Sequence, residues 1–327
     1  MEVKLPNSFK PESLTLLEKR LKESQLVNDV NVDFSSLYWS YPMAMLVAGS
    51  YFRRWIKVRR DNDLKTTYRG ISKSRNAHTY LMHLGFFDYI GIKDIGNKVG
   101  SANGNTRYLP IRKISLEELN NSIAETGEKL IDAINFVAGS MARVLSGDDI
   151  SETNKAFSYS IREIIRNALE HSGSDCCYIC AQKWANGQSE IAIVDEGCGI
   201  YSSLSQAYSI GEKDALKHSL KPGVTRTEFL SEEENVYNNS GFGLYVLSEM
   251  GSSFGWFCIG SGTQKLIFEK QEDTVSSLDF SGTFVGVHLN SHPKSFQGVL
   301  SDIIQVGEVE SEKEGRHSSA SELSKRV

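Results

Sequence analysis

The 327-residue sequence contains no apolar run that approaches the length of a membrane-spanning helix, and its N-terminus shows no charged-then-apolar signal pattern. The five cysteines are an odd number, and three of them cluster at Cys176, Cys177 and Cys180. An odd and clustered set does not fit the disulfide framework of a secreted domain. We therefore expect a protein of the reducing cytoplasm with no membrane association.

Blocks of basic residues are also absent. The net charge is −5, from 36 Lys and Arg against 41 Asp and Glu, so nucleic acid is not an expected partner, although a local basic patch stays open. Cys177 and Cys180 have the spacing of half a zinc site, but no second pair of cysteines exists. We interpret these cysteines as small apolar residues of a strand.

The stretch 157–172 has the apolar spacing of an amphipathic helix. Its buried stripe is predicted to consist of Ile161, Ile164, Ile165, Ala168 and Leu169. Glu163 and Asn167 are four residues apart, so they lie on one flank of that helix. Asn167 would offer an oxygen to a hard cation such as Mg²⁺, and Glu163 would take a proton from a nucleophile. A solvated helix face is the alternative interpretation of this pair.

A second segment of interest lies directly after the apolar run 191–194. Asp195 follows that run, and Gly197 and Gly199 come directly after it. This pattern predicts a buried strand that ends in a tight turn, where glycines would let a ligand approach the backbone closely. An ordinary β-turn explains the same residues equally well when they are considered alone.

A third segment, 239–251, places Gly241 and Gly243 directly before a short helical pattern. Backbone N–H groups at the N-terminus of a helix are a common phosphate-binding site, and glycines leave them accessible. An ordinary loop is the alternative. Each glycine pair is a weak signal alone, and only the three segments together indicate a ligand site.

In this order and spacing, the segments resemble the GHKL (Bergerat-fold) ATP-binding family, which includes gyrase, MutL, the large heat-shock chaperone and histidine kinases. The matching positions are Glu163 and Asn167 in a first box, Asp195, Gly197 and Gly199 in a second, Gly241, Gly243 and Leu244 in a third, and Gly282 and Thr283 before a final strand. The resemblance covers about residues 116–290. It is specific for nucleotide binding and much less specific for the use of the nucleotide.

The resemblance implies that Glu163 is catalytic and orients a nucleophile, and that Asn167 holds Mg²⁺ to the triphosphate of ATP. Asp195 would accept a hydrogen bond from the adenine amino group, so that ATP is preferred over GTP. The nucleotide-binding residues that it implies are Asn167, Asp195, Gly197, Gly199, Ile200, Ser240, Gly241, Phe242, Gly243, Leu244 and Thr283.

The first 112 residues have the pattern of a small α/β unit. Helices are predicted at 12–22, 42–55 and 75–87, and a strand at 30–34. The run 32–46 resembles the STAS family, in which a strand that ends in Asp leads to a helix whose first turn carries a phosphoacceptor Ser or Thr. That acceptor position falls near Pro42 and Met43, so the acceptor is missing. The resemblance implies an interaction domain rather than a phosphorylation substrate.

Five basic residues gather toward the end of the second predicted helix: Arg53, Arg54, Lys57, Arg59 and Arg60. Cations at this place interact favourably with the C-terminal end of a helix, which is the simplest explanation. Binding of phosphate or of an acidic partner is the alternative.

The second half is predicted to begin near 113 with a long amphipathic helix through 144, after a loop or hairpin at 95–110. Strands are predicted at 176–184, 190–194, 254–259, 265–269 and 284–289. The polar connection 201–240 is typical of a mobile lid, from which Lys221 or Arg226 would reach the γ-phosphate. An exposed cation is the equal alternative for either residue.

These patterns predict an α+β protein with a STAS-like α/β interaction domain at 1–112, a GHKL two-layer α/β sandwich at 113–306 and a flexible tail at 307–327. We expect a Mg-dependent ATPase, a hydrolase that acts as a nucleotide-dependent switch on a partner protein or on its own N-terminal domain. The alternatives are a serine/threonine protein kinase similar to the anti-sigma kinases, and an ATP-sensing scaffold without hydrolysis. A protein partner is expected, and a homodimer is a further alternative.

Overall fold

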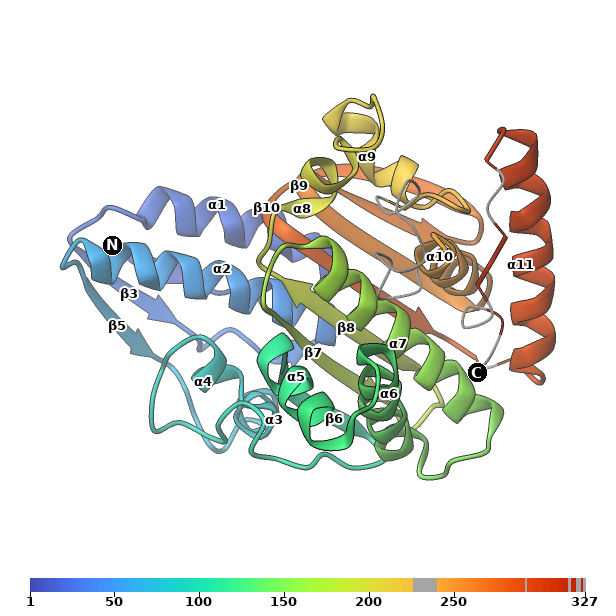
Figure 1. Ribbon diagram of the computed structural model, residues 1–327. Coiled ribbons are helices and arrows are strands. Elements are labelled where there is room, and N and C mark those ends of the chain that lie inside the picture. The colour runs from blue at the N-terminus through green and yellow to red at the C-terminus, as the bar shows by residue number, and fades with distance from the viewer. Residues whose placement is uncertain (226–239, 292, 317–318, 322–324, 326–327) are drawn as a thin grey trace.

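The computed structural model describes residues 1–225, 240–291, 293–316, 319–321 and 325, and this part of the chain is a mixed α/β protein (Figure 1). Its strands form a three-stranded sheet, a two-stranded sheet and a five-stranded sheet. Within the described ranges, no helix combines the length and the apolar character needed to cross a membrane.

The N-terminal unit, residues 1–89, alternates strands and helices. Its elements are β1 (Glu2–Lys4), β2 (Ser8–Phe9), a 3₁₀ turn (Pro11–Ser13), α1 (Leu14–Ser24), β3 (Asp29–Asp33), β4 (Trp39–Ser40), α2 (Pro42–Asp61), β5 (Lys65–Arg69), α3 (Asn76–Leu84) and α4 (Phe86–Tyr89). Neighbouring strands of the β1-β3-β5 sheet are parallel, so α1 and α2 are the crossover helices that parallel pairing requires. The predicted elements at 12–22, 30–34 and 42–55 are confirmed as α1, β3 and α2.

The remaining elements are β6 (Tyr108–Ser115), α5 (Leu116–Thr126), α6 (Leu130–Ser146), α7 (Glu152–His171), β7 (Cys176–Lys183), β8 (Ser189–Asp195), α8 (Gly199–Leu204), α9 (Glu212–Ser219), α10 (Gly243–Phe254), β9 (Gly255–Glu269), β10 (Glu272–Leu289) and α11 (Phe296–Lys313). The strands form one sheet in the order β6-β7-β8-β10-β9 with antiparallel neighbours throughout. The helix predicted at 157–172 is confirmed as α7, and the strand predicted to end at Asp195 is confirmed as β8. Cys177 and Cys180 are buried in β7, as interpreted.

Three predictions were wrong in extent. The long helix predicted through 144 is two helices, because Gly127 adopts the left-handed conformation with φ of 72° and ends α5. The strands predicted at 254–259 and 265–269 are one strand, β9, which pairs with β10 along its whole length. The glycines between them accompany a register shift in the β10 ladder instead of a turn. The helix predicted at 75–87 is likewise divided, at Gly85, into α3 and α4.

Two of the predicted boundaries, the one between the domains near 113 and the start of the tail at 307, fall inside a strand and a helix. The boundary near 113 lies within β6, where Lys113 pairs with Tyr178 of β7, so this strand belongs to the large sheet. The segment expected to be a flexible tail from 307 is helical through Lys313, because α11 packs against α7 and α10.

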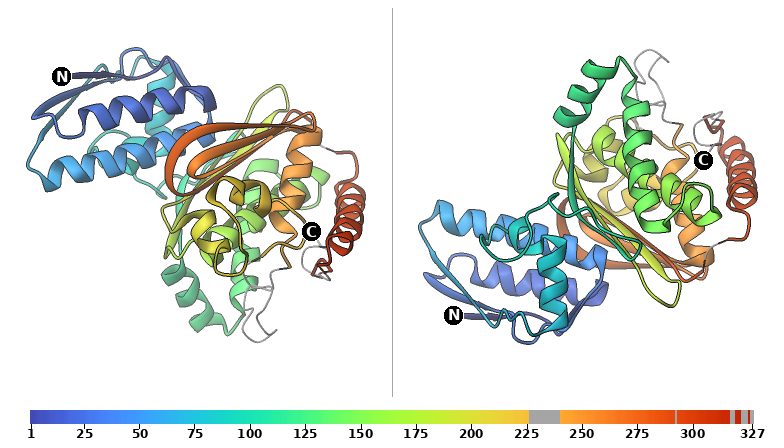
Figure 2. Two further views of the ribbon diagram at one scale, coloured as in Figure 1. Left: turned by 90° about the horizontal axis from the view of Figure 1, so that it is seen from above. Right: turned by 90° about the horizontal axis from the view of Figure 1, so that it is seen from below.

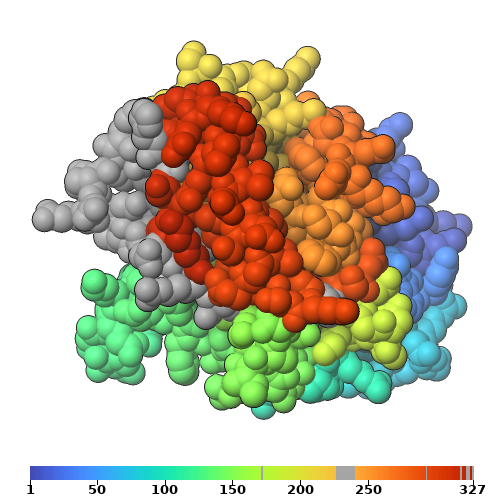
Figure 3. Space-filling view, turned by 90° about the vertical axis from the view of Figure 1, so that its right-hand side faces the viewer, coloured from blue at the N-terminus to red at the C-terminus, as the bar shows by residue number. Residues whose placement is uncertain are grey.

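Both faces of the large sheet are covered (Figure 2). On β8, Ile191 and Ile193 pack in the core that contains α7 and α10, whereas Ala192 and Val194 pack in the core of the N-terminal unit. Successive side chains of a strand point to opposite faces, so an uninterrupted apolar run is the expected sequence of a strand buried on both. The helix α11 lies outside α7 and α10 and forms much of the outer surface on that side (Figure 3).

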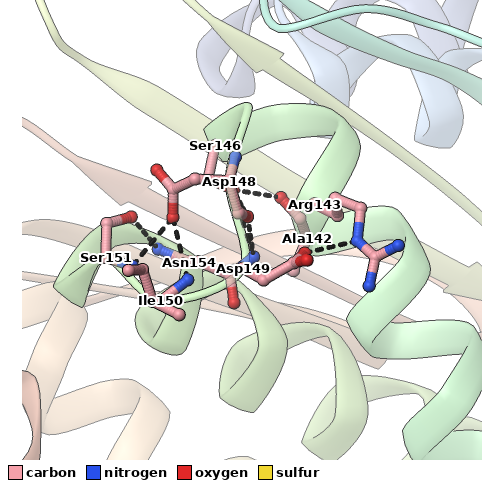
Figure 4. A network of polar contacts seen from close by, with 8 residues as sticks. All are labelled: Ala142, Arg143, Ser146, Asp148, Asp149, Ile150, Ser151 and Asn154. Carbon is pink, nitrogen blue, oxygen red and sulfur yellow. Dashed lines mark hydrogen bonds and ion pairs between the residues drawn. The ribbon is translucent and has the colours of Figure 1, made fainter.

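A network of polar contacts sets the start of α7 (Figure 4). Ser151 is the N-cap residue, and its hydroxyl accepts a hydrogen bond from the Asn154 backbone N–H at 3.0 Å. The Asn154 amide donates to the Asp148 carbonyl at 2.8 Å, and the Asp148 carboxylate accepts from the Ser151 N–H at 2.8 Å. These bonds satisfy N–H groups that a helix start leaves unpaired, and they fix the angle between α6 and α7.

The buried guanidinium of Arg59 holds the N-terminal unit together. The side chain is 0 % exposed, although arginine is rarely buried completely. Its acceptors are the carbonyl oxygens of Ser24, Gln25, Val27, Asn28 and Lys65 and the hydroxyl of Thr66. One side chain of α2 therefore anchors the α1–β3 loop and the start of β5. We had explained this arginine, with its basic neighbours, by an interaction with the C-terminal end of the helix; its hydrogen bonds instead extend to other elements of the unit.

Replacing Arg59 with methionine is expected to lower the free energy of unfolding by about 3 kcal/mol or more, because several buried carbonyl groups would lose their donor. Arg60→Met on the same helix is the matched control, since the Arg60 side chain is 75 % exposed. Urea unfolding followed by tryptophan fluorescence measures both changes. Equal losses in the two variants would contradict the role assigned to Arg59.

Candidate functional site

A pocket lies between α7, the start of α10, the end of β8 and the middle of β10, with about 690 Å³ of empty space that opens to solvent. The predicted residues that line it are Asn167, Asp195, Gly199, Ile200, Gly241, Gly243, Leu244 and Thr283. Glu163, Gly197, Ser240 and Phe242 are not among the lining residues. The three sequence segments thus meet in one cavity.

Asp195 ends β8 and is the buried carboxylate of the pocket, with 3 % of its surface exposed. Its Oδ1 accepts hydrogen bonds from the backbone N–H groups of Gly197, at 3.0 Å, and Thr283, at 3.2 Å. Burial raises the pKa of Asp195 to about 7, and the two backbone donors limit the rise. The carboxyl group therefore changes its charge near neutral pH.

Two glycines of the predicted motifs make close contact with α7. A Cβ atom on Gly197 would lie 2.0 Å from the Ser172 carbonyl oxygen, and one on Gly243 would lie 2.4 Å from Oε2 of Glu163. Gly197 has no room for a side chain because the obstructing atom belongs to the backbone, whereas a side chain at Gly243 would require the Glu163 carboxylate to move. This close packing, more than access for a ligand, explains why glycine occupies these positions.

The N-terminus of α10 opens into the pocket. The N-cap residue is Phe242, whose side chain is buried and offers no acceptor, and Gly243 and Leu244 form part of the pocket wall. A helix of 12 residues carries partial positive charge at this end, and its first N–H groups need acceptors. The arrangement favours an anionic group at this end of the pocket.

Asn167 reaches the pocket from α7. Its amide nitrogen is shielded from water and makes no hydrogen bond to any residue that the structure describes. A buried amide nitrogen without an acceptor is costly, so it is typical of a group that an acceptor atom of a ligand satisfies. The side chain is suited to bind a polar ligand from the helix side of the cavity.

Glu163 is placed differently from the expectation of a catalytic base. It is 3 % exposed, and its Oε1 accepts hydrogen bonds from Arg162 Nε at 2.9 Å and Arg166 Nη1 at 3.0 Å. Burial alone would raise its pKa, but the charges of the two arginines outweigh burial and hold the pKa of Glu163 below its ordinary value. A carboxylate in two ion pairs is a weak base, so in this conformation Glu163 is poorly suited to accept a proton.

The predicted lid is described only in part. Its described portion contains α8 and α9, and Lys221 forms an ion pair of 3.0 Å with Glu314, after the end of α11. Lys221 is not among the residues that line the pocket. Arg226, the other residue expected to reach a phosphate, lies outside the described residues.

Several lining residues were not predicted: Ile164, Ala168, Ser172, Ile193, Ser203, Leu204, Ser219, Val224, Thr225 and Val285. Ile164 and Ala168 flank Asn167 on α7, and Ile193 and Val285 are two positions from Asp195 and Thr283 on their strands. Helical and strand periodicity could have found these four. Val224 and Thr225 carry no local signal, because their place depends on how the connection folds back.

The raised pKa of Asp195 predicts a stability effect with a defined sign. An unfolded aspartate has a pKa near 3.9, so between about pH 4 and 7 the folded state binds more protons and stability falls as the pH rises. Asp195→Asn keeps the oxygen that accepts from Gly197 and Thr283 and removes the buried charge. We expect it to stabilise the protein by about 1–4 kcal/mol at pH 8, and by progressively less toward pH 4.

Thermal unfolding of both forms from pH 4.5 to 8.5 measures this difference. Asp302→Asn on the exposed face of α11 is the control, which we expect to be neutral at every pH. A gain for Asp195→Asn that is the same at both ends of the range would refute a buried charge as its cause.

No protein-family model matches the sequence, and a search of curated proteins returns no match. What the pocket binds therefore follows from the chemistry of its lining: a buried carboxyl group at one end, an amide from α7, and a helix N-terminus.

Proposed function

We propose that the pocket binds an adenine nucleotide and that the protein is a nucleotide-dependent switch. The observation that carries this proposal is the meeting of Asp195, Asn167 and the α10 N-terminus in one cavity. The apolar side chains Ile193, Ile200 and Leu204 beside Asp195 suit a flat base, and the carboxylate suits its exocyclic amino group. Guanine carries a carbonyl oxygen where adenine carries that amino group, and the carboxylate would repel it.

Another part of the pocket wall suits phosphates. The N-terminus of α10 would accept the negative charge, and Asn167 would hold a Mg²⁺ ion through its amide oxygen. The amide nitrogen of Asn167, which makes no hydrogen bond to a described residue, would donate to a phosphate oxygen at the same time. Mg²⁺ would supply neutralisation of the phosphate charge. Water would complete its shell, as is usual for this ion.

The fold supports the same assignment. We propose that the antiparallel sheet with α7 and α10 on one face is a GHKL-type two-layer sandwich, in agreement with the sequence motifs. We further propose that the N-terminal unit is a STAS-like interaction module, since β3 ends at Asp33 and leads through a loop to α2. In such an arrangement, nucleotide binding would control a protein partner or the N-terminal unit itself.

The ion pairs of Glu163 favour a second candidate, an ATP sensor without hydrolysis. A general base must offer a lone pair to the nucleophile, and both oxygens of Glu163 are already hydrogen-bonded to Arg166. ATP hydrolysis at this site would first require the arginines to move away from Glu163. If the arginines can move away from Glu163, the protein would be a slow ATPase whose rate depends on that change. If they cannot, it would be a sensor that binds ATP without hydrolysis.

Nucleotide binding is tested by calorimetry on the full chain. We expect ATP with Mg²⁺ to bind at least about a hundredfold more tightly than GTP, because a buried carboxylate left facing a carbonyl oxygen is costly. ATP affinity should fall as the pH drops below about 7, since protonation of Asp195 weakens the acceptor, and the slope should approach about tenfold per pH unit. The absence of any heat with ATP or ADP would refute the proposed function.

The fate of the γ-phosphate separates the candidates. We expect Glu163→Gln to retain ATP binding and to lower any hydrolysis by about 10²–10⁴-fold, with Glu125→Gln on the exposed face of α5 as the control. Labelled ATP reports the outcome: released phosphate supports the ATPase, and a labelled protein partner supports the kinase. Unchanged ATP in the wild-type protein supports the sensor. Full hydrolysis by Glu163→Gln would exclude Glu163 as the base.

A further inference from the structure

The helix α2 of the N-terminal unit lies on the sheet face opposite the pocket, yet it contacts both chain segments that position Asp195 (Figure 2). One segment is the turn after β8, which contains Glu196. The other is the part of β10 that precedes Thr283, where the ladder with β9 shifts its register twice. Four side chains of α2 make these contacts: Ser50, Tyr51, Arg53 and Arg54.

Glu196 lies between Asp195 and Gly197 and points toward α2. The Ser50 hydroxyl donates a hydrogen bond to its Oε1 at 2.7 Å, and the Nε of Arg53 lies 3.5 Å from the same oxygen. Arg53 is itself fixed, because its Nη1 donates to the hydroxyl of Tyr178 at 2.8 Å. Its guanidinium also lies over the rings of Tyr89 and Tyr178, at 5.0 and 4.6 Å from their centres. The turn after β8 is therefore tied to a preorganised cation.

The segment of β10 before Thr283 is held by two further contacts. The Tyr51 hydroxyl donates to the carbonyl oxygen of Asp279 at 2.9 Å, and Arg54 donates to the carbonyl oxygen of Ser281. The guanidinium of Arg54 lies 4.9 Å from the ring centre of Phe280. Carbonyl groups at a register shift lose their ladder partners, so side chains from α2 replace the strand as donors.

Both anchored segments supply the backbone donors of Asp195. One donor is the N–H of Gly197, directly after Glu196, and the other is the N–H of Thr283, two residues after Ser281. Asp195 and Thr283 are also register partners in the antiparallel pairing of β8 with β10. A displacement of α2 would therefore move the carboxylate and both of its donors.

We infer that Ser50, Arg53 and Arg54 are positioning residues for the pocket, through which the N-terminal unit controls nucleotide affinity. The inference rests on the proposed function and names its regulation. Coupling between two sites is reciprocal, so a partner that binds the N-terminal unit and shifts α2 would change nucleotide affinity by the same factor that the nucleotide changes partner affinity. Because α2 belongs to the N-terminal unit and contacts both segments that position Asp195, partner binding and nucleotide binding would act on the same helix.

The test compares single substitutions on α2 in the full chain, with Mg-ATP and Mg-ADP as probes in calorimetry. Arg53→Gln is expected to weaken both nucleotides about tenfold, because it removes a charge-assisted contact to the Asp195 turn, and Ser50→Ala is expected to weaken them less. The equal effect on ATP and ADP follows because the contact lies at the base end and not at the phosphates. Arg60→Gln, on the exposed face of α2, should leave both affinities unchanged.

A double-mutant cycle with Glu196→Gln separates positioning from general destabilisation. If Arg53 acts through Glu196, the second substitution should have no further effect. The ATP affinity of Arg53→Gln/Glu196→Gln should then be no lower than that of whichever single variant has the lower ATP affinity. Additive losses would show that Arg53 affects the pocket by another route, and would overturn the inference. Ser50→Ala removes only one hydrogen bond, so it tests the same contact even if Arg53→Gln fails to fold.

Hydrogen exchange gives a readout that needs no nucleotide. In Arg53→Gln and Ser50→Ala, the amides of 195–200 and 281–284 should exchange faster than in the wild-type protein, while those of α6 should not change. Unchanged exchange together with unchanged nucleotide affinity would overturn the inference. If wild-type protein binds no adenine nucleotide, the proposed function fails, and the exchange rates still decide whether α2 positions this turn.

Discussion

The antiparallel pairing of β8 with β10 is the constraint on which the site depends. It places Thr283 opposite Asp195, where β8 ends and its pairing with β10 begins. The carboxylate then receives one N–H from its own turn and one from the neighbouring strand. A one-residue slip would direct these side chains to the other face of the sheet, since alternation along a strand has a period of two. The position of the pocket is therefore set by the same register that packs the core.

The N-terminal unit is an integral part of this structure, because it shares a core with the large sheet. Buried residues of α2 pack against Ala192, Val194 and Phe284, on the face away from the pocket. Polar groups in this interface are also paired: the Met43 backbone N–H donates to Glu190 at 2.8 Å, and His288 Nδ1 lies 3.3 Å from the same carboxylate. Separation of the two parts would expose apolar surface and leave buried polar groups without partners. The two parts are therefore held together by apolar burial and by paired polar groups.

Two buried carboxyl groups near the pocket have opposite electrostatic environments. Burial raises the pKa of Asp195 to about 7, and its hydrogen-bond donors and the more distant charge of Arg54 limit the rise. Glu163 is equally buried, but Arg166 and Arg162 hold its pKa below the ordinary value. Environments that push two pKa values apart assign different roles to the two groups. Asp195 can change its charge near neutral pH, whereas Glu163 remains an ionised partner of Arg162 and Arg166.

Local periodicity was sufficient to predict α7, the strand that ends at Asp195 and the helix that starts at Gly243, because each is encoded by neighbouring residues. The meeting of these segments in one cavity was predicted only through the family resemblance. The arginine contacts of Glu163 lie on its own helix, but pattern alone did not reveal that both side chains turn toward it. Other features come from contacts between separate parts of the chain. They are the continuous strand β9, the inclusion of β6 in the large sheet, and the hydrogen bonds from α2 to Glu196 and Ser281. Such contacts form because two apolar faces must be buried at once, and no short stretch of sequence specifies which face will cover which.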